Sequence, residues 1–384
     1  MLDLIKFELY KIFSKKSVII VLLLTVLFSV YGAIGESIYI KFKGLDSIGD
    51  AYNIMEQYEG KVITQEGLDK ANKTVEDIIQ KERSGKNLTK EELVYKQYLF
   101  DGLVNDAVFK VNNEYYTLSE MKDEISNIEK GDMINTYKHK SLKYVYDKVK
   151  DVEESKYYFN HGWMITTDFK IIATLISILI VVGLASIFSD DYQSNSAQII
   201  LSCRRGKNKL VLSKIIAGLT FTVIVFFIIN SVFLISALSY DFIGWDKPLE
   251  LFKYYRSTPF DMRIIDFYIV GLCISFISAI LFALATMLIS LVVKNNMISL
   301  LVSLAMYYAP TFIVQVVPID TVSKFLNEIN IEQAMGVEGM FVNPNTYNIL
   351  GNPVLYPTVL ISLVIIFIPI VTYLIKYLGK RQVI

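Results

Sequence analysis

Six apolar runs, separated by polar or charged segments, constrain the fold of this chain more than any other feature of its sequence. A rise of about 1.5 Å per residue means that about 20 apolar residues in a helix cross a hydrocarbon core of about 30 Å. The fourth and fifth runs are separated only by Lys294-Asn295-Asn296, and one helix over both would be far longer than a bilayer requires. We therefore expect six transmembrane helices, over residues 17–35, 169–188, 210–239, 264–293, 297–317 and 357–378.

The composition also favours a membrane protein. Hydrophobic residues make up 53% of the sequence and charged residues 20%, which is unusual for a soluble enzyme of this size. The net charge is zero, and no segment is basic enough to predict a nucleic-acid partner. Cys203 lies in a basic loop and Cys273 in an apolar run, so neither a disulfide framework nor a metal site is predicted. No Ala-x-Ala cleavage pattern follows the first run, which we interpret as an uncleaved span.

Lysine and arginine residues set the expected orientation. They flank the apolar runs in groups: Lys6, Lys11, Lys15 and Lys16; then Arg204, Arg205, Lys207 and Lys209; then Lys294; and finally Lys376, Lys380 and Arg381. With six spans all these groups fall on one side of the membrane, and the positive-inside rule assigns that side to the cytoplasm. Both termini are therefore expected inside the cell, and residues 36–168 outside.

The remaining segments follow from this topology. Residues 1–16 carry Leu2, Ile5, Leu9, Ile12 and Phe13 on one helical face, with Glu8 and the lysines elsewhere. That pattern predicts an interfacial helix on the cytoplasmic side, the alternative being a simple extension of the first span. The other expected segments are a cytoplasmic loop at 189–209, extracellular segments at 240–263 and 318–356, a tight cytoplasmic turn at 294–296 and a cytoplasmic tail at 379–384.

The segment 36–168 is long enough to form a small extracellular domain. Thr89-Lys90-Glu91-Glu92 is a capping-box pattern that starts a helix, and Thr117-Leu118-Ser119-Glu120 starts another that ends near Gly131. Between them Asn112-Asn113 is typical of a two-residue turn and predicts a short β-hairpin. The expected fold class is an all-α polytopic membrane protein with six transmembrane helices and a mostly helical extracellular domain containing that hairpin.

No catalytic set is recognisable, so we do not expect an enzyme, a metal site or a cofactor in this chain. Gly206-Lys207 is followed by Asn208 and lacks the upstream glycine of a phosphate-binding loop. His139 and His161 do not have zinc-peptidase spacing, and no serine has the context of a nucleophile elbow.

Polar residues inside the expected spans are few. The candidates are Asn230, Ser275, Ser278 and Gln315. Such groups either hydrogen-bond to neighbouring helices or mark a transport pathway. Because the span interiors contain almost no charge, an amphipathic or lipid-like cargo fits this chain better than a small inorganic ion or a proton.

The stretch 189–214, between the second and third spans, is the most distinctive cytoplasmic segment. It presents, in order, Asp190 and Asp191, Asn195-Ser196, the apolar residues 199–201 with Ser202, Arg204-Arg205-Gly206-Lys207, and Lys214. At matching spacing this stretch resembles the corresponding loop in permease subunits of ABC-2 type ABC transporters, with Asn195 in place of the family's glycine and Arg204 about where its proline stands. Residues 347–353, before the last span, also resemble the segment that precedes span six in such permeases from low-GC Gram-positive bacteria.

The resemblance implies half of an ATP-driven exporter in a bacterial cell membrane, moving an amphipathic peptide, drug or lipid-like cargo. Two permeases would pair, as a homodimer or a heterodimer among membrane lipids, and each would bind a separate ABC ATPase subunit that holds ATP and Mg. The residues expected at the ATPase interface are Asp190, Asp191, Gln193, Arg204, Arg205 and Lys207. For the basic residues, topology signalling and contact with anionic lipid are equally open interpretations.

A second hypothesis comes from a different functional class. A non-transporting membrane receptor or scaffold, whose extracellular domain binds a peptide, phage or cell-wall ligand, would show the same plan of one span, a large outside domain and five further spans. The presence or absence of an ATPase partner distinguishes the two hypotheses.

Overall fold

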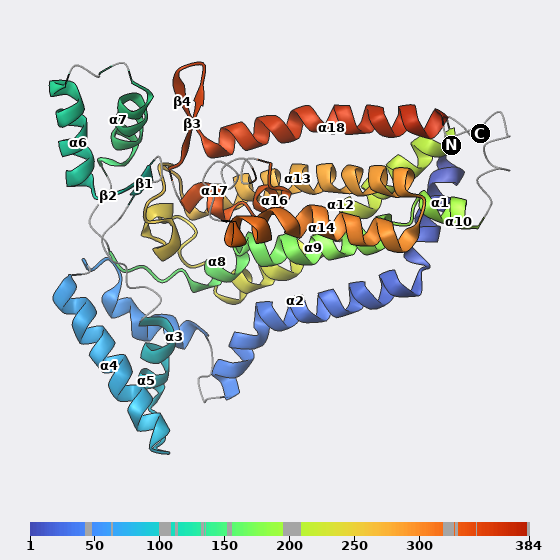
Figure 1. Ribbon diagram of the computed structural model, residues 1–384. Helices are drawn as coiled ribbons and strands as arrows, with labels where there is room; N and C mark the ends of the chain where they lie inside the picture. Colours follow the sequence, from blue (N-terminus) through green and yellow to red (C-terminus); the bar gives the residue numbers. More distant parts are fainter. Residues whose placement is uncertain are drawn as a thin grey trace.

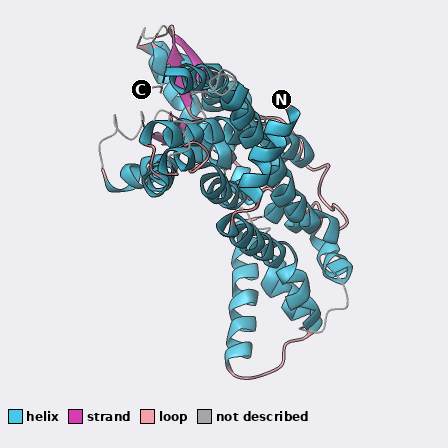
Figure 2. Ribbon diagram, turned by 90° about the vertical axis from the view of Figure 1, so that its right-hand side faces the viewer, coloured by secondary structure: helices cyan, strands magenta, loops and turns pink. Residues whose placement is uncertain are grey.

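The computed structural model describes residues 1–42, 48–62, 64–99, 109–111, 114–131, 134, 136–151, 156–194, 209–317, 326, 329–342 and 344–381. Within these residues the chain is mostly helical, and the strands form two antiparallel pairs (Figures 1 and 2).

Long helices form one bundle. They are α2 (Lys16–Phe42), α9 (Phe169–Leu184), α12 (Val211–Ser239), α13 (Ile264–Val293), α14 (Asn296–Val316) and α18 (Tyr356–Arg381). Of the described residues, five helical segments are long and apolar enough to cross a membrane, one of them comprising α8 (His161–Thr166), α9 and α10 (Ser189–Gln193). α2 meets this criterion only together with α1 (Leu2–Phe13), from which it is bent by 68°. The chain therefore has the character of a multi-pass membrane protein.

The observed helices lie close to the predicted boundaries. α13 coincides with the expected 264–293, and α12, α14 and α18 each begin within one residue of the expected start. The turn at 294–296 is as tight as predicted, because Lys294 adopts a φ of +57° and the Asn295 side chain accepts hydrogen bonds from the first amides of α14. α2 continues to Phe42, beyond the expected end at 35, and α9 ends at Leu184, before the expected 188.

α9 lies at the centre of the bundle, with α12 and α13 beside it (Figure 1). Its residues Ile172, Ile176 and Leu179 are fully buried by the neighbouring helices. This position suits a helix that is apolar all round, because such a helix has no polar face to present to water. α14 and α18 bury little of their apolar surface. Phe312 and Ile365, for example, are exposed.

The two ends of the bundle differ. α1, α10 and the last turns of α18 lie at one end, here called the terminal end (Figure 1). The helices between α2 and α8, here called the insert, project from the opposite end, here called the insert end. At the terminal end Ile12 is buried, and the ring of Phe13 lies 5.2 Å from that of Phe221 on α12. Residues 1–16 were expected to bury their apolar face in the membrane interface. In the structure Ile5, Leu9, Ile12 and Phe13 of that face pack against the bundle core, whereas Leu2 is exposed.

The described part of the insert forms two lobes with separate hydrophobic cores. The first contains α3 (Ile48–Met55), η1 (Glu56–Tyr58), α4 (Gln65–Arg83), α5 (Lys90–Val94) and η2 (Tyr95–Leu99); the second contains β1 (Phe109–Val111), β2 (Glu114–Tyr116), α6 (Leu118–Lys130) and α7 (Tyr137–Val149). Both predicted capping boxes are confirmed, Thr89 with Glu92 at α5 and Thr117 with Glu120 at α6. β1 and β2 pair antiparallel, with Phe109 opposite Tyr116. Asn112 and Asn113, expected to form the turn, lie outside the described residues.

The segment 318–356, expected to be extracellular, contains regular structure in its described part. It forms α16 (Ile331–Gly336), α17 (Glu338–Val342), β3 (Thr346–Ile349) and β4 (Asn352–Leu355), and the last two pair antiparallel. α16 and α17 pack onto the insert ends of α9 and α13, where the ring of Phe341 lies 5.2 Å from that of Phe267. The Ser141 hydroxyl on α7 lies 2.6 Å from that of Thr346 on β3, which connects the second lobe to the bundle. The short 3-10 helices η4 (Leu249–Leu251) and η5 (Lys253–Tyr255) complete the insert end.

Candidate functional site

Lys214, in the first turn of α12, is almost fully buried at the terminal end of the bundle. Its Nζ donates hydrogen bonds to Glu8 Oε2 at 2.9 Å and to the Ile187 carbonyl at 2.7 Å, and it lies 3.1 Å from Asp191 Oδ2. Glu8 is buried as well. Two carboxylates and a carbonyl thus replace water around this ammonium group, which is the condition under which a protein interior tolerates a charge.

Lys11 of α1 and Lys15, in the link between α1 and α2, extend this arrangement to α10. Lys11 Nζ lies 3.3 Å from Asp191 Oδ1 and 3.6 Å from Glu8 Oε1, and Lys15 Nζ lies 2.6 Å from Asp190 Oδ2. Among the described residues, three carboxylates are therefore matched by three ammonium groups. We call these six residues the ionic cluster: Glu8, Lys11, Lys15, Asp190, Asp191 and Lys214.

The turn between α13 and α14 is bonded to the same region. The side chain of Asn296 donates to Asp190 and accepts from Ser189 Oγ at 2.5 Å. Ser290 Oγ accepts from the backbone amides of Phe188 and Ser189, each at 3.1 Å. α10 is therefore fixed to α1, α12, α13 and α14 at once.

The residues predicted at a partner interface divide into two groups. Asp190 and Asp191 belong to the ionic cluster, where Asp191 is mostly enclosed by Lys11 and Lys214. Gln193, by contrast, is exposed on α10. Arg204, Arg205 and Lys207 lie outside the described residues.

Sequence reasoning missed the role of Glu8, which was placed off the apolar face of residues 1–16. The spacing contained the signal, since Glu8 follows Ile5 by three residues and precedes Ile12 by four, and so shares their face. A carboxylate on a buried helix face needs a basic partner, and Lys214 lies near the start of the third apolar run.

The polar residues predicted inside the spans do not form a common site. Asn230 is buried and donates to the Phe226 carbonyl of its own helix at 2.9 Å. Ser275 and Ser278 are buried on α13, and Gln315 is exposed near the end of α14. Within the described part of the chain no hydrogen bond joins any two of these four residues.

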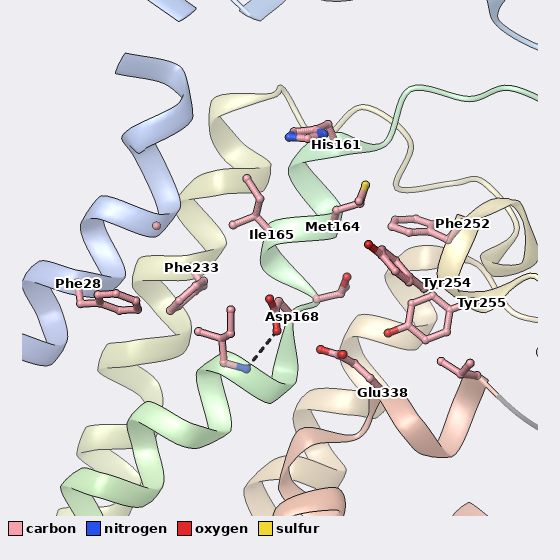
Figure 3. Close-up of a pocket in the computed structure, with 14 residues that line it drawn as sticks. Phe28, His161, Met164, Ile165, Asp168, Phe233, Phe252, Tyr254, Tyr255 and Glu338 are labelled. Atoms are coloured by element: carbon pink, nitrogen blue, oxygen red, sulfur yellow. Dashed lines mark hydrogen bonds between the residues drawn. The ribbon is translucent and has the colours of Figure 1, made fainter. Parts of the chain in front are cut away.

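A cavity of about 450 Å³ opens at the insert end of the bundle. Figure 3 shows Phe28 and Phe233 on one side of it, Tyr254 and Tyr255 on the other, and the carboxyl groups of Asp168 and Glu338 between them. α2, α8, α12, η5 and α17 all contribute residues. The walls are predominantly apolar and aromatic, and the two carboxyl groups and the His161 ring lie among them.

The two carboxyl groups are held in place by backbone amides. Asp168 Oδ1 accepts from the amide of Ile171 at 3.1 Å and so caps α9, and Glu338 Oε1 accepts from the amide of Lys170 at 3.1 Å. The Asp168 carboxyl group also lies near Glu338, between the same aromatic walls. Burial, with the nearby Asp168 carboxylate as the next cause, raises the pKa of Glu338 to about 8, because both effects disfavour a second negative charge. Glu338 is therefore mostly protonated near pH 7.

Sequence reasoning did not find this cavity. Asp168 was assigned as the last residue before the second span, and Glu338 as part of an extracellular connection. These two residues are 170 positions apart, and no local pattern pairs them.

A scan against known protein families, a search of curated proteins and a search of solved structures each found no match to this chain. The candidate sites therefore have to be interpreted from their own geometry.

Proposed function

We propose that this chain is the transmembrane permease subunit of an ATP-driven exporter of the ABC-2 type, which moves an amphipathic cargo and is powered by a separate ATPase subunit. The observation that supports the proposal most is the ionic cluster, which ties α10 to the N-terminal helix and to the start of α12. Because α10 is fixed in this way, a displacement of α10 by a partner protein would be transmitted to several spans together.

The mechanical argument depends on how the charges are distributed. Lys214 meets carboxylates from two different elements, Glu8 of α1 and Asp191 of α10. Moving α10 alone would leave charges buried without partners, which is costly. We infer that α1, α10 and the first turn of α12 move as one unit when a partner displaces α10.

The proposed topology has six spans, with α2 crossing first and the terminal end in the cytoplasm. The described lysines Lys11, Lys15, Lys294 and Lys380 all belong to elements or turns at that end, which agrees with the positive-inside rule. The two lobes of the insert then lie outside the cell.

The proposed contact with the ATPase is narrower than the set predicted from the sequence. We assign Asp190 and Asp191 to holding α10 in place, because their carboxylates already pair with lysines of this chain. Gln193, exposed on α10, together with Arg204, Arg205 and Lys207 in the segment that follows, is proposed to meet the ATPase.

Affinity purification of the full chain from its native host tests the proposal. An ABC ATPase subunit is expected to co-purify. Adding the purified chain to that ATPase is expected to change the rate at which the ATPase hydrolyses ATP. Purification without any ATPase, together with the absence of an ATPase gene beside its own, would overturn the exporter proposal and favour the receptor hypothesis.

A charge-reversal variant tests the contact itself. Arg204→Glu with Arg205→Glu is expected to release the ATPase while the chain still inserts in the membrane. The matched control is Arg83→Glu with Lys86→Glu, which reverses two exposed basic residues at the end of α4 in the insert and is expected to retain the ATPase. Equal ATPase recovery with both variants would refute the assigned contact.

A further inference from the structure

We propose that the cavity at the insert end is a binding site for a lipophilic organic cation, a quaternary ammonium or similar positive centre carried on an apolar body. The proposal goes beyond export, because binding requires no ATPase and is tested on this chain alone.

The size and the lining of the cavity indicate a small amphipathic molecule. Its volume of about 450 Å³ lies within the range of about 300–1,000 Å³ that is usual for small-molecule sites. The aromatic side chains Phe28, Phe233, Phe252, Tyr254 and Tyr255 contribute to its walls. Water gains little from contact with such walls, whereas an apolar ligand that fills the cavity removes apolar surface from water.

The sign of the ligand charge follows from the polar groups. Asp168 and Glu338 both face the cavity between its aromatic walls (Figure 3), and no lysine or arginine is among the described residues that line it. Aromatic faces add to this preference, since their quadrupole attracts cations within about 6 Å. An anion would meet the two carboxyl groups directly, whereas the nearby Lys170 side chain is not among the groups that line the cavity.

The carboxyl pair is also fixed before a ligand arrives. Asp168 is held by the Ile171 amide at the start of α9, and Glu338 by the Lys170 amide. Preorganised groups of this kind lose little conformational freedom on binding, so more of the contact energy appears as affinity.

The test uses two permanently charged probes of the same shape and opposite charge, tetraphenylphosphonium and tetraphenylborate. Equilibrium binding of each probe is measured on the full chain in a non-ionic detergent, with protein-free micelles subtracted. We expect saturable binding of the cation and none of the anion. Adding phosphatidylcholine then tells a free organic cation from a lipid headgroup, because a headgroup that occupies the cavity competes with the phosphonium probe.

Conservative variants locate the binding. Asp168→Asn keeps the helix cap, since asparagine is also a good N-cap residue, and Glu338→Gln keeps an oxygen facing the Lys170 amide. Asp168→Asn is expected to weaken cation binding by about tenfold, as expected for loss of one charged contact. Glu338→Gln is expected to weaken it less near pH 7, because Glu338 is mostly protonated before the cation binds. The matched control is Asp266→Asn, which removes a carboxylate paired with Arg263 at the insert end of α13 and is expected to leave binding unchanged.

Aromatic variants keep the proposal testable if a carboxyl variant does not fold. Phe28 and Tyr254 are more than half exposed, so their truncation to alanine is compatible with folding. Each is expected to weaken binding several-fold. Equal binding of both probes, or cation binding that none of these variants changes, would overturn the proposal.

Discussion

Lys214 Nζ donates a 2.9 Å hydrogen bond to Glu8 Oε2 across a separation of 206 residues, and both side chains are almost completely removed from solvent. This contact joins the first helix of the chain to the start of α12. It stands beside a second carboxylate, Asp191, so that the lysine is the shared partner of two otherwise unrelated elements.

Replacing Lys214 with methionine is expected to destabilise the protein by about 3–5 kcal/mol, because Glu8 is left buried without its closest positive partner. The free energy of unfolding in mixed detergent micelles measures this loss. Lys209→Met, an exposed lysine five residues earlier, serves as the control and is expected to have little effect. Equal losses in the two variants would show that the buried pair does not stabilise the fold.

A double-mutant cycle tests whether α1 and α12 are energetically coupled. The losses of Glu8→Gln and Lys214→Met are expected to be non-additive by about 1–3 kcal/mol, with the double variant more stable than their sum predicts. The reason is that removing both members leaves no charge stranded, since Asp191 keeps Lys11 at 3.3 Å. Strictly additive losses would contradict the inference that α1 and the first turn of α12 move as one unit.

Gly183 permits the close approach of α9 to α12. A Cβ atom at this position would lie 2.4 Å from the ring of Phe221, which is fully buried. Gly183→Ala is therefore expected to cost about 1–3 kcal/mol, or to separate the two helices. Gly339→Ala is the matched control, because nothing lies within 4 Å of its added atom. Thermal unfolding of both variants in detergent measures the difference.

Cysteine labelling tests the proposed topology. In a background without Cys203 and Cys273, a cysteine replacing the exposed Gly131 at the end of α6 is expected to react with a membrane-impermeant maleimide added to intact cells. A cysteine replacing the exposed Lys294 is expected to react only after the cells are permeabilised. The reverse pattern would invert the orientation.

Proton release tests the carboxyl pair in the insert-end cavity. Glu338 has its pKa raised to about 8, so it is mostly protonated near pH 7. The groups that face it are Asp168, Lys170 and Tyr255, and a bound cation adds positive charge beside them. Positive charge favours the carboxylate, which lowers the pKa and releases a proton.

Calorimetry of tetraphenylphosphonium binding in buffers of different ionisation enthalpy measures this release. Up to about one proton is expected near pH 7, and almost none near pH 9.5, where Glu338 is already ionised. Glu338→Gln is expected to abolish the buffer dependence. Proton uptake on binding, or release that persists in this variant, would refute the assignment.

The prediction from sequence was most accurate where the physical cause is local. The bounds of α13, the tight turn at Lys294 and the capping boxes of Thr89 and Thr117 each follow from a few neighbouring residues. Helical spacing also predicted that one face of residues 1–16 would be buried. It assigned that face to the membrane interface, whereas Ile12 and Phe13 pack against the bundle, because spacing alone does not distinguish lipid from protein as an apolar environment.

The segment at 318–356 shows the opposite case. α16 and α17 have only six and five residues, and helices of this length are stabilised by what they pack against. Their partners are Phe169 and Phe267, on helices that come much earlier in the chain. Sequence periodicity therefore had no signal for them, and the cavity that Glu338 lines was missed with them.

The sequence by itself determined that this chain has several membrane-length apolar helices, where most of them begin and end, and where its lysines cluster, because each of these depends on hydropathy and charge along short stretches. Only the tertiary structure decided which charges meet. Glu8 with Lys214, and Asp168 with Glu338, are paired by helices that pack together from distant parts of the chain. Burial then gives each pair its chemistry, since removal from water is what makes an ion pair costly to break and what raises the pKa of a carboxyl group.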